Sequence, residues 1–434
     1  MRFLITTTLL SVAIFTNAQT NQTTTELVMS MSQRSLVMPG YLTELKALVA
    51  RQAYQFWKEG NVEPYVSHLN VYQALYEANK YLGYDSVKNM AYNQVGMHAN
   101  TVTSVVFGNE ANHFYSSSTD GKILKWDLSN PRAIPKTVYE SDKIIQSIEM
   151  SNDGKVLMAI FYQEGLALIP TEQNPQEDIR VLEDPQPVQA ATFIPGKRKY
   201  LMVAKTGELI LKGFDAQSEQ VGKTALKVNQ LKIDEQDGTI YAGTEQGILE
   251  AWEKPYEVKE SPIDDIMKNW RKQSYFGYEL GSFAINCLDI SPDGNTLAIG
   301  RDRGDVILWD IPNKNLIRII SGHQSTVTDI QFSPKGDLLL STSRDGTARI
   351  WDLTDSRKLP IILDDHGDWV FTGSFNPTGT QVITGGGDEY IRTWPVDPVY
   401  FALRICAMVD RPLTPDEWAE FVGKDIPFQM TCDN

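Results

Sequence analysis

The sequence predicts an all-β fold, a seven-bladed β-propeller with small helical N- and C-terminal flanks. Three observations lead to it: copies of one residue pattern that align without gaps, a repeat interval of about 42 residues, and short β-type runs between turn signals. A ring of blades with four strands each requires this interval and this alternation of strand and turn.

The residue pattern consists of a histidine, a turn aspartate and a tryptophan. The aspartate follows the histidine at +22 and the tryptophan at +28, with a valine at +4 and a phenylalanine at +9. Chance does not give four equal offsets in three places, so these segments are repeats. The three sets are His98, Asp120 and Trp126; His323, Asp345 and Trp351; and His366, Asp388 and Trp394.

A tight-turn glycine, or the residue in its place, marks each repeat unit. The intervals between the marks are 44, 42, 40, 57, 42 and 43 residues, which predicts seven blades over residues 85–397. The one long interval predicts an insertion at 254–284. The marks are Gly121, Gly165, Gly207, Gly247, Gly304, Gly346 and Glu389.

The pairs Gly322-His323 and Trp351-Asp352 resemble the signature of the WD-repeat proteins, and the resemblance covers roughly residues 87–396. In that family the histidine, the turn aspartate, a strand serine or threonine and the tryptophan form a hydrogen-bonded chain within a blade. The resemblance assigns these roles to the three sets above. The serine or threonine stays open between neighbours such as Ser341 and Ser343.

Other blades depart from the pattern. Blade five keeps Trp309 but has Gly281 and Arg303 where the histidine and aspartate belong, and blades two and three lack the tryptophan. Complete sets occur only in blades one, six and seven, which become neighbours when the ring closes. One hypothesis is that the complete sets make the blades beside the closure of the ring more rigid. Sequence drift in the other blades explains the pattern almost as well. We expect residues 87–94 to supply the outer strand of blade seven.

Helices are predicted on both sides of the ring. Helix-type apolar spacing in residues 39–84 predicts a helical pair, and the tail at 398–434 contains a capping box formed by Thr414 and Glu417. Segments 43–57 and 413–432 resemble those that bracket the WD-repeat halves of bacterial multidomain signalling NTPases. Because no NTPase half stands in this sequence, only a sensing or docking role carries over.

The first residues predict export. Arg2 precedes an apolar run that ends in small residues, which is typical of a signal peptide over 1–18 that is cut after Ala18, followed by a linker at 19–38. The run of about thirteen residues is short of the roughly 20 that a membrane-spanning helix needs. We therefore expect a periplasmic or secreted protein without a transmembrane anchor.

Charge and composition limit the chemistry. The chain has a formal charge of -15, which disfavours nucleic acid as a partner. The five histidines form no metal or triad spacing, so we predict no catalytic residue, no cofactor and no metal. Cys406 and Cys432 flank the capped helix, and we favour a disulfide between them over two free thiols. Cys287 lies in a strand pattern and is expected to be buried.

These features favour an exported, non-enzymatic scaffold that binds other proteins. Such a scaffold could be a subunit of a cell-envelope or secretion assembly. The alternative is a ligand sensor or an enzyme that uses the central channel of the propeller. Trp369 directly precedes the +4 valine of blade seven and should lie at the rim of the ring, where an exposed tryptophan is a common binding hot spot. Arg301 and Arg303 are expected to flank the same face.

A short helix is predicted in the insertion, starting at Ser261-Pro262. Its apolar stripe includes Met267 and Trp270, and a stripe this short needs something to pack on. Two possibilities stay open: the stripe covers the side of blades four and five, or Met267 and Trp270 anchor a partner protein.

Overall fold

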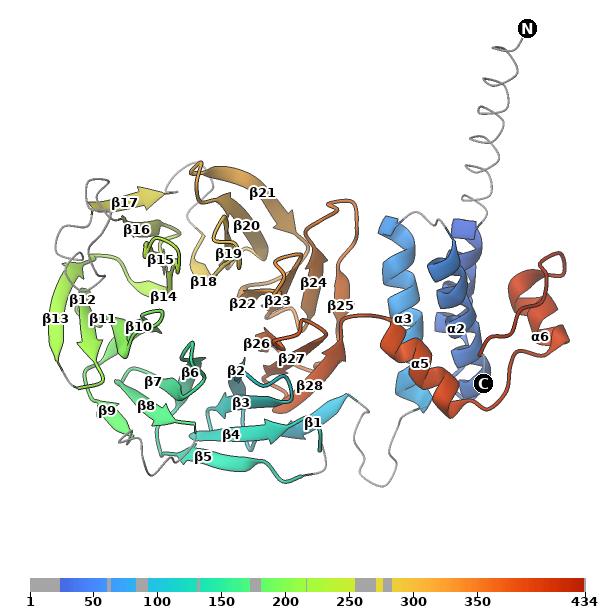
Figure 1. Cartoon of the computed structure of the whole chain (residues 1–434), viewed down its shortest axis with the longest axis horizontal. Helices are drawn as coiled ribbons and strands as arrows, with labels where there is room; N and C mark the ends of the chain where they lie inside the picture. The colour runs from blue at the N-terminus through green and yellow to red at the C-terminus, as the bar shows by residue number, and fades with distance from the viewer. Residues whose placement is uncertain are drawn as a thin grey trace, which may run out of the picture. The chain divides into compact units, whose positions relative to one another are not determined.

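The computed structural model of the chain describes residues 24–60, 64–82, 93–130, 133–171, 181–215, 217–253, 271–275 and 283–432. The chain forms two compact units, one with the helices and one with nearly all of the propeller strands. Seven four-stranded sheets are arranged in a ring, with the first strand of each of them nearest the centre (Figure 1). The predicted all-β, seven-bladed propeller with helical flanks is confirmed.

In the first six blades, each sheet is a run of four consecutive strands. Blade one consists of β2 (Val102–Phe107), β3 (His113–Ser118), β4 (Lys122–Asp127) and β5 (Lys136–Glu140). Blade two consists of β6 (Ile145–Met150), β7 (Val156–Phe161), β8 (Leu166–Pro170) and β9 (Leu182–Asp184). Blade three consists of β10 (Val188–Phe193), β11 (Lys199–Ala204), β12 (Glu208–Gly213) and β13 (Ser218–Lys223).

The next three blades continue the series. Blade four consists of β14 (Val228–Ile233), β15 (Ile240–Thr244), β16 (Leu249–Glu253) and β17 (Arg271–Tyr275). Blade five consists of β18 (Ile285–Ile290), β19 (Thr296–Arg301), β20 (Asp305–Asp310) and β21 (Asn315–Ser321). Blade six consists of β22 (Val327–Phe332), β23 (Leu338–Ser343), β24 (Ala348–Asp352) and β25 (Ile361–Leu363).

The ring closes through a strand from the N-terminal side of the propeller. Blade seven contains β26 (Val370–Phe375), β27 (Gln381–Gly386) and β28 (Tyr390–Pro395), and β1 (Gln94–Met97) pairs with β28 as its outer strand. We predicted residues 87–94 for this strand. The described strand begins at Gln94, and residues 87–92 lie outside the described residues.

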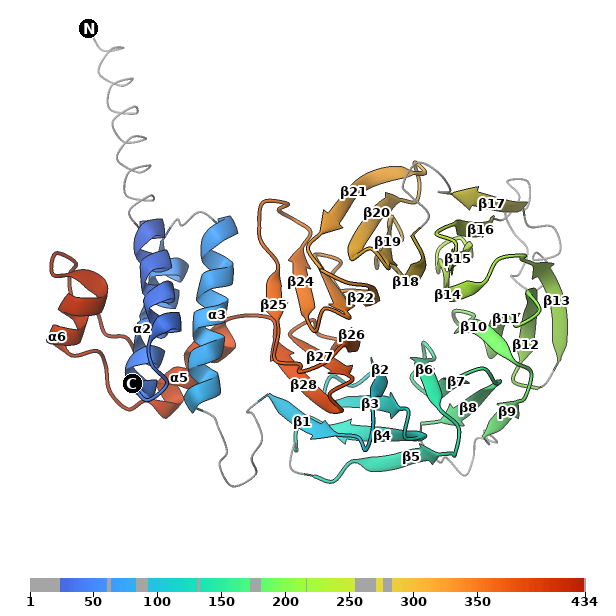
Figure 2. The same cartoon turned by 180° about the vertical axis from the view of Figure 1, so that it is seen from behind.

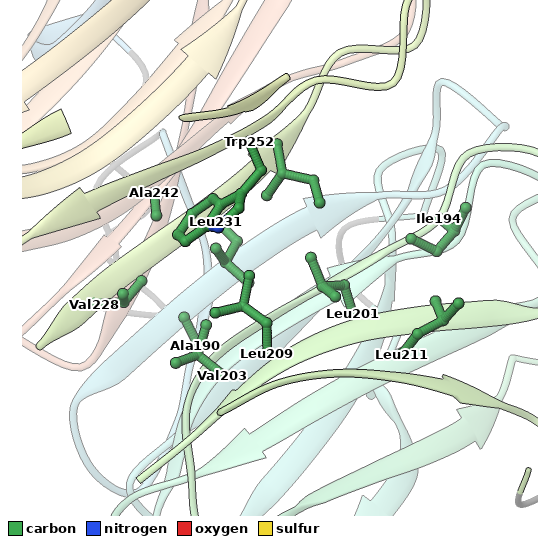
Figure 3. Packing of buried hydrophobic residues seen from close by; sticks show 11 residues of the cluster. Ala190, Ile194, Leu201, Val203, Leu209, Leu211, Val228, Leu231, Ala242 and Trp252 are labelled. Carbon is green, nitrogen blue, oxygen red and sulfur yellow. The ribbon is translucent and has the colours of Figure 1, made fainter. Parts of the chain in front are cut away.

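Apolar side chains fill the layers between neighbouring blades. Successive residues of a strand point to opposite faces, and each blade has a neighbour on both faces, so the second strand of a blade is buried at nearly every position. β7 is buried at all of its positions. Figure 3 shows one such layer, in which Leu201 and Leu209 of blade three pack toward Leu231 and Trp252 of blade four.

The helical unit contains α2 (Thr43–Glu59), α3 (Pro64–Leu82), α5 (Val399–Met408), α6 (Pro415–Trp418) and η2 (Ala419–Gly423). The predicted capping box of Thr414 and Glu417 is present. Cys406 of α5 forms a disulfide with Cys432, as we favoured. Among the described residues, no helix has the length and apolar character that crossing a membrane requires.

Our prediction of a linker over 19–38 is wrong from residue 24 onward, because residues 24–37 form a helix. Val28 is fully buried. The hydroxyl of Ser35 donates to the backbone oxygen of Lys46 (2.9 Å), and the Lys46 ammonium donates to the backbone oxygen of Leu36 (3.1 Å). Packing on α2 thus supplies the stability that the threonine- and serine-rich sequence does not have alone.

The predicted insertion at 254–284 includes a strand. Residues 271–275 form β17, the outer strand of blade four. The helix expected from Ser261, with Met267 and Trp270, lies outside the described residues and stays a prediction.

Candidate functional site

The histidine, aspartate and tryptophan of blade one form a continuous hydrogen-bonded chain with a strand serine. The buried ring of His98 places Nδ1 3.1 Å from Asp120 Oδ2 and Nε2 2.7 Å from Ser116 Oγ, and Trp126 Nε1 donates to the same hydroxyl (2.7 Å). Burial lowers the pKa of His98, which favours the neutral ring. Because a carboxylate only accepts, Nδ1 donates to Asp120 and Nε2 accepts from Ser116. Each buried polar group therefore has a partner, which fixes the blade.

Blade six repeats this geometry and identifies its hydroxyl member. His323 Nδ1 lies 2.9 Å from Asp345 Oδ2, and Nε2 lies 2.8 Å from Ser341 Oγ. Ser343 instead donates to the backbone oxygen of Ser325 (3.1 Å). Trp351 of this blade is buried. In blade seven the contacts are His366 Nδ1 to Asp388 Oδ1 (3.0 Å), His366 Nε2 to Thr384 Oγ1 (2.7 Å) and Trp394 Nε1 to Thr384 Oγ1 (2.8 Å).

Blade five, which lacks the histidine and the aspartate, uses a buried ion pair. Arg301 is only 3% exposed, and its Nε donates to Asp305 Oδ1 (2.8 Å). Our prediction that Arg301 flanks a partner-binding face is therefore wrong, because Asp305 holds the guanidinium inside the blade. Arg303 is exposed, and its guanidinium lies 5.2 Å from the centre of the Phe283 ring.

Trp369 is half-exposed in the loop that leads into β26, with 47% of its surface accessible. The Arg344 guanidinium lies 4.9 Å from the centre of its ring, and the Phe371 ring stands edge-on at 6.0 Å. The backbone oxygen of Trp369 accepts a hydrogen bond from the Gly387 amide (2.8 Å), which anchors the loop. We call Trp369, Arg344 and Phe371 the Trp369 site. Its ring is held in place while one part of it stays open, as a binding hot spot requires.

Two residues of the Trp369 site were not predicted. Arg344 directly precedes the turn aspartate Asp345, and Phe371 follows Trp369 by two positions, which brings the two aromatic rings into contact. The repeat register carries both signals.

Comparison with known proteins agrees with the geometry of the blades. The family described as "WD domain, G-beta repeat" matches residues 93–127, 272–310, 314–352 and 357–395. In these four ranges the chain carries WD40 repeats. Each matched range holds the outer strand of one blade and three strands of the next, so the WD40 repeat runs across the boundary between blades.

The chain is similar to several eukaryotic WD-repeat proteins. WD repeat and SOCS box-containing protein 1 of Homo sapiens is 33% identical over 102 residues, which is 23% of this chain and 24% of that protein. Its Danio rerio counterpart is 33% identical over 153 residues (33% and 35%), and Jouberin of Rattus norvegicus is 32% identical over 163 residues (37% and 15%). The chain thus covers about a third or less of these relatives. The WD40 matches do not include the flanking helices, whose resemblance to signalling NTPases stays a prediction.

Charged side chains of the innermost strands connect neighbouring blades. Asp289 Oδ2 accepts from the Phe332 amide (2.8 Å), and Asp329 Oδ2 accepts from the Gly373 amide (3.2 Å). Lys232 Nζ lies 3.2 Å from Asp289 Oδ1. Nothing in the repeat pattern marks these residues, so the sequence does not predict their role. Among the described residues, no group of three or more histidine, cysteine or acidic side chains is arranged to hold a metal ion.

Replacing Asp329 with asparagine is expected to stabilise the propeller at pH 8 and to change it little at pH 4. Burial raises the pKa of Asp329 from 3.8 to about 6. A carboxyl whose pKa is higher in the folded state destabilises that state once it ionises, so the cost is full above about pH 6 and vanishes below about pH 4. The gain at pH 8 should be on the order of 2 kcal/mol. Thermal unfolding of both proteins from pH 4 to pH 8 checks this, and a gain that does not vary with pH contradicts it.

Proposed function

We propose that this chain is a non-enzymatic docking platform that binds another protein through the Trp369 site. The observation that carries the proposal is a half-exposed tryptophan held by an arginine and a second aromatic ring. Tryptophan and arginine are the residue types that most often dominate protein interfaces. The printed names of the relatives, which describe WD-repeat proteins, also support it.

A sensor or an enzyme at the centre of the ring is the alternative. The carboxylates there accept hydrogen bonds from the backbone of the next blade, as Asp289 does from Phe332 and Asp329 does from Gly373. These bonds give the charged groups a structural task, which favours docking over chemistry as the function.

The docking proposal predicts that Trp369→Ala weakens partner binding without unfolding the protein. Residues 19–434, immobilised and exposed to an envelope extract, should retain specific proteins that the variant retains at least about tenfold less well, because hot-spot residues contribute 2 kcal/mol or more. Quantitative mass spectrometry measures this. Tyr400→Ala is a control with similar exposure, at 46%, in the helical unit. Equal retention by the wild type and Trp369→Ala would sink the proposal.

We also propose that the protein is exported and that it can serve as a subunit of a cell-envelope assembly. The Cys406–Cys432 disulfide supports an oxidising compartment. Cleavage after Ala18 is expected, and the intact mass of protein from the native host should correspond to a chain that starts at Gln19. A mass that retains Met1 contradicts export by this route. Co-sedimentation with a large membrane-bound complex checks the assembly.

A further inference from the structure

The outer strand of blade five, β21, presents a long apolar edge. It is the last strand of its sheet, so one edge of its backbone has no strand partner in that sheet. Three aliphatic side chains on it are exposed: Leu316 at 42%, Ile317 at 49% and Ile319 at 40%. Figure 2 shows β21 on the perimeter of the ring.

The other outer strands have the features that protect a sheet edge. β9 and β25 have three residues each and β1 has four, whereas β21 has seven. β5 ends at Glu140, β13 contains Glu219, and β17 begins with two basic residues. Short length and charged residues keep edges from pairing with other chains. β21 differs from them because it has seven residues, three exposed aliphatic side chains and a single charged residue, so it is available for strand addition.

The register of β21 leaves a regular edge for pairing. Leu316 lies opposite Trp309 and Arg318 lies opposite Leu308 of β20, so Ile317 forms a bulge between them. From Arg318 to Ser321 the pairing with β20 is continuous. The bulge therefore interrupts only the start of the strand.

Charge indicates what occupies the edge. Arg318 is the only charged residue of β21, and among the described residues no carboxylate forms an ion pair with it. Antiparallel pairing with a second copy would bring two Arg318 side chains together and join two chains of formal charge -15. Like charges in opposed strands are destabilising. A partner with a carboxylate fits, and a second copy does not.

We propose that β21 binds an extended segment of another protein, which adds a fifth strand to blade five. Backbone hydrogen bonds along the edge provide affinity, and side chains provide selectivity. The segment carries aliphatic residues against the exposed side chains of β21 and one carboxylate beside Arg318, where cross-strand neighbours are about 5 Å apart. This surface is separate from the Trp369 site.

A charge exchange tests the proposal. The probe is a capped, fluorescently labelled peptide in which valine and threonine alternate around one central glutamate; a second peptide has lysine there, and a third has proline on both sides of the glutamate. Wild type should bind the glutamate peptide, and Arg318→Glu should bind it at least about tenfold more weakly and prefer the lysine peptide. The proline peptide should bind at least about tenfold more weakly to wild type, because proline donates no backbone hydrogen bond.

Lys136→Glu is the matched control, because Lys136 of β5 lies opposite Lys125 as Arg318 lies opposite Leu308. It should bind the glutamate peptide as wild type does, and so should Trp369→Ala. The proposal is overturned if wild type does not bind the glutamate peptide below about 1 mM, or if Arg318→Glu keeps the preference of wild type. Because these assays do not use the Trp369 site, their outcome is independent of the proposed function.

Discussion

Gly96→Val is expected to open the ring. Gly96 lies in β1, and a Cβ atom on it would come 2.3 Å from the Trp126 ring, far inside van der Waals contact. The valine must displace either the tryptophan or the closing strand. Overpacking of this kind costs about 3 kcal/mol, and loss of the closing strand also exposes the edge of β28. The free energy of unfolding, measured in denaturant, should fall by at least this amount.

Gly367→Val is the control for this experiment, since a Cβ atom on Gly367 meets no other atom within 4 Å. It should change the free energy of unfolding by less than about 1 kcal/mol. If Gly96→Val unfolds at the same denaturant concentration as wild type, β1 does not close the ring as described.

The second large effect is expected for Trp394→Ala in blade seven. The side chain is fully buried, and its Nε1 donates to Thr384 Oγ1 at 2.8 Å. Removing it leaves a large cavity and takes away one member of the chain that includes His366. The loss of a buried tryptophan costs about 4 kcal/mol. Chemical unfolding measures the loss, and near-ultraviolet circular dichroism reports whether the remaining aromatic packing is retained.

Trp394→Phe separates packing from hydrogen bonding, because phenylalanine fills much of the space but lacks the N–H donor. Loss of the donor alone should lower the free energy of unfolding by about 1–2 kcal/mol, in addition to any loss from packing. Trp369→Ala, which removes a half-exposed tryptophan, should cost less than about 1 kcal/mol. Equal losses for Trp394→Ala and Trp369→Ala would contradict the assignment of Trp394 to the core.

Repetition made the blades predictable. Histidine, aspartate and tryptophan recur at fixed offsets, so blade number and the networks around His98, His323 and His366 could be read without coordinates. The choice between Ser341 and Ser343 could not, because both lie on one face of the strand and only the strand register shows which hydroxyl His323 reaches.

Features outside the repeat pattern were harder to predict. The helix at 24–37 has a composition typical of a linker and forms because Val28 is buried and Ser35 bonds to α2, which are tertiary effects. The sequence suggests that Arg301 is a surface residue, because the ion pair with Asp305 across the tight turn is visible only in the structure. The roles of the carboxylates between blades could not be predicted, because their partners lie about 43 positions away in the sequence, as Phe332 does from Asp289.

Hydrogen–deuterium exchange on the chain with its captured partner tests the docking claim most directly. Exchange should slow in residues 341–346 and 366–371, which carry the Trp369 site, because a partner that covers Trp369 and Arg344 shields their backbone from solvent. Slower exchange at Asn315–Ser321 would belong to the separate β21 surface. If the partner binds and exchange at 341–346 and 366–371 does not change, the Trp369 site is not the docking surface and the account is contradicted.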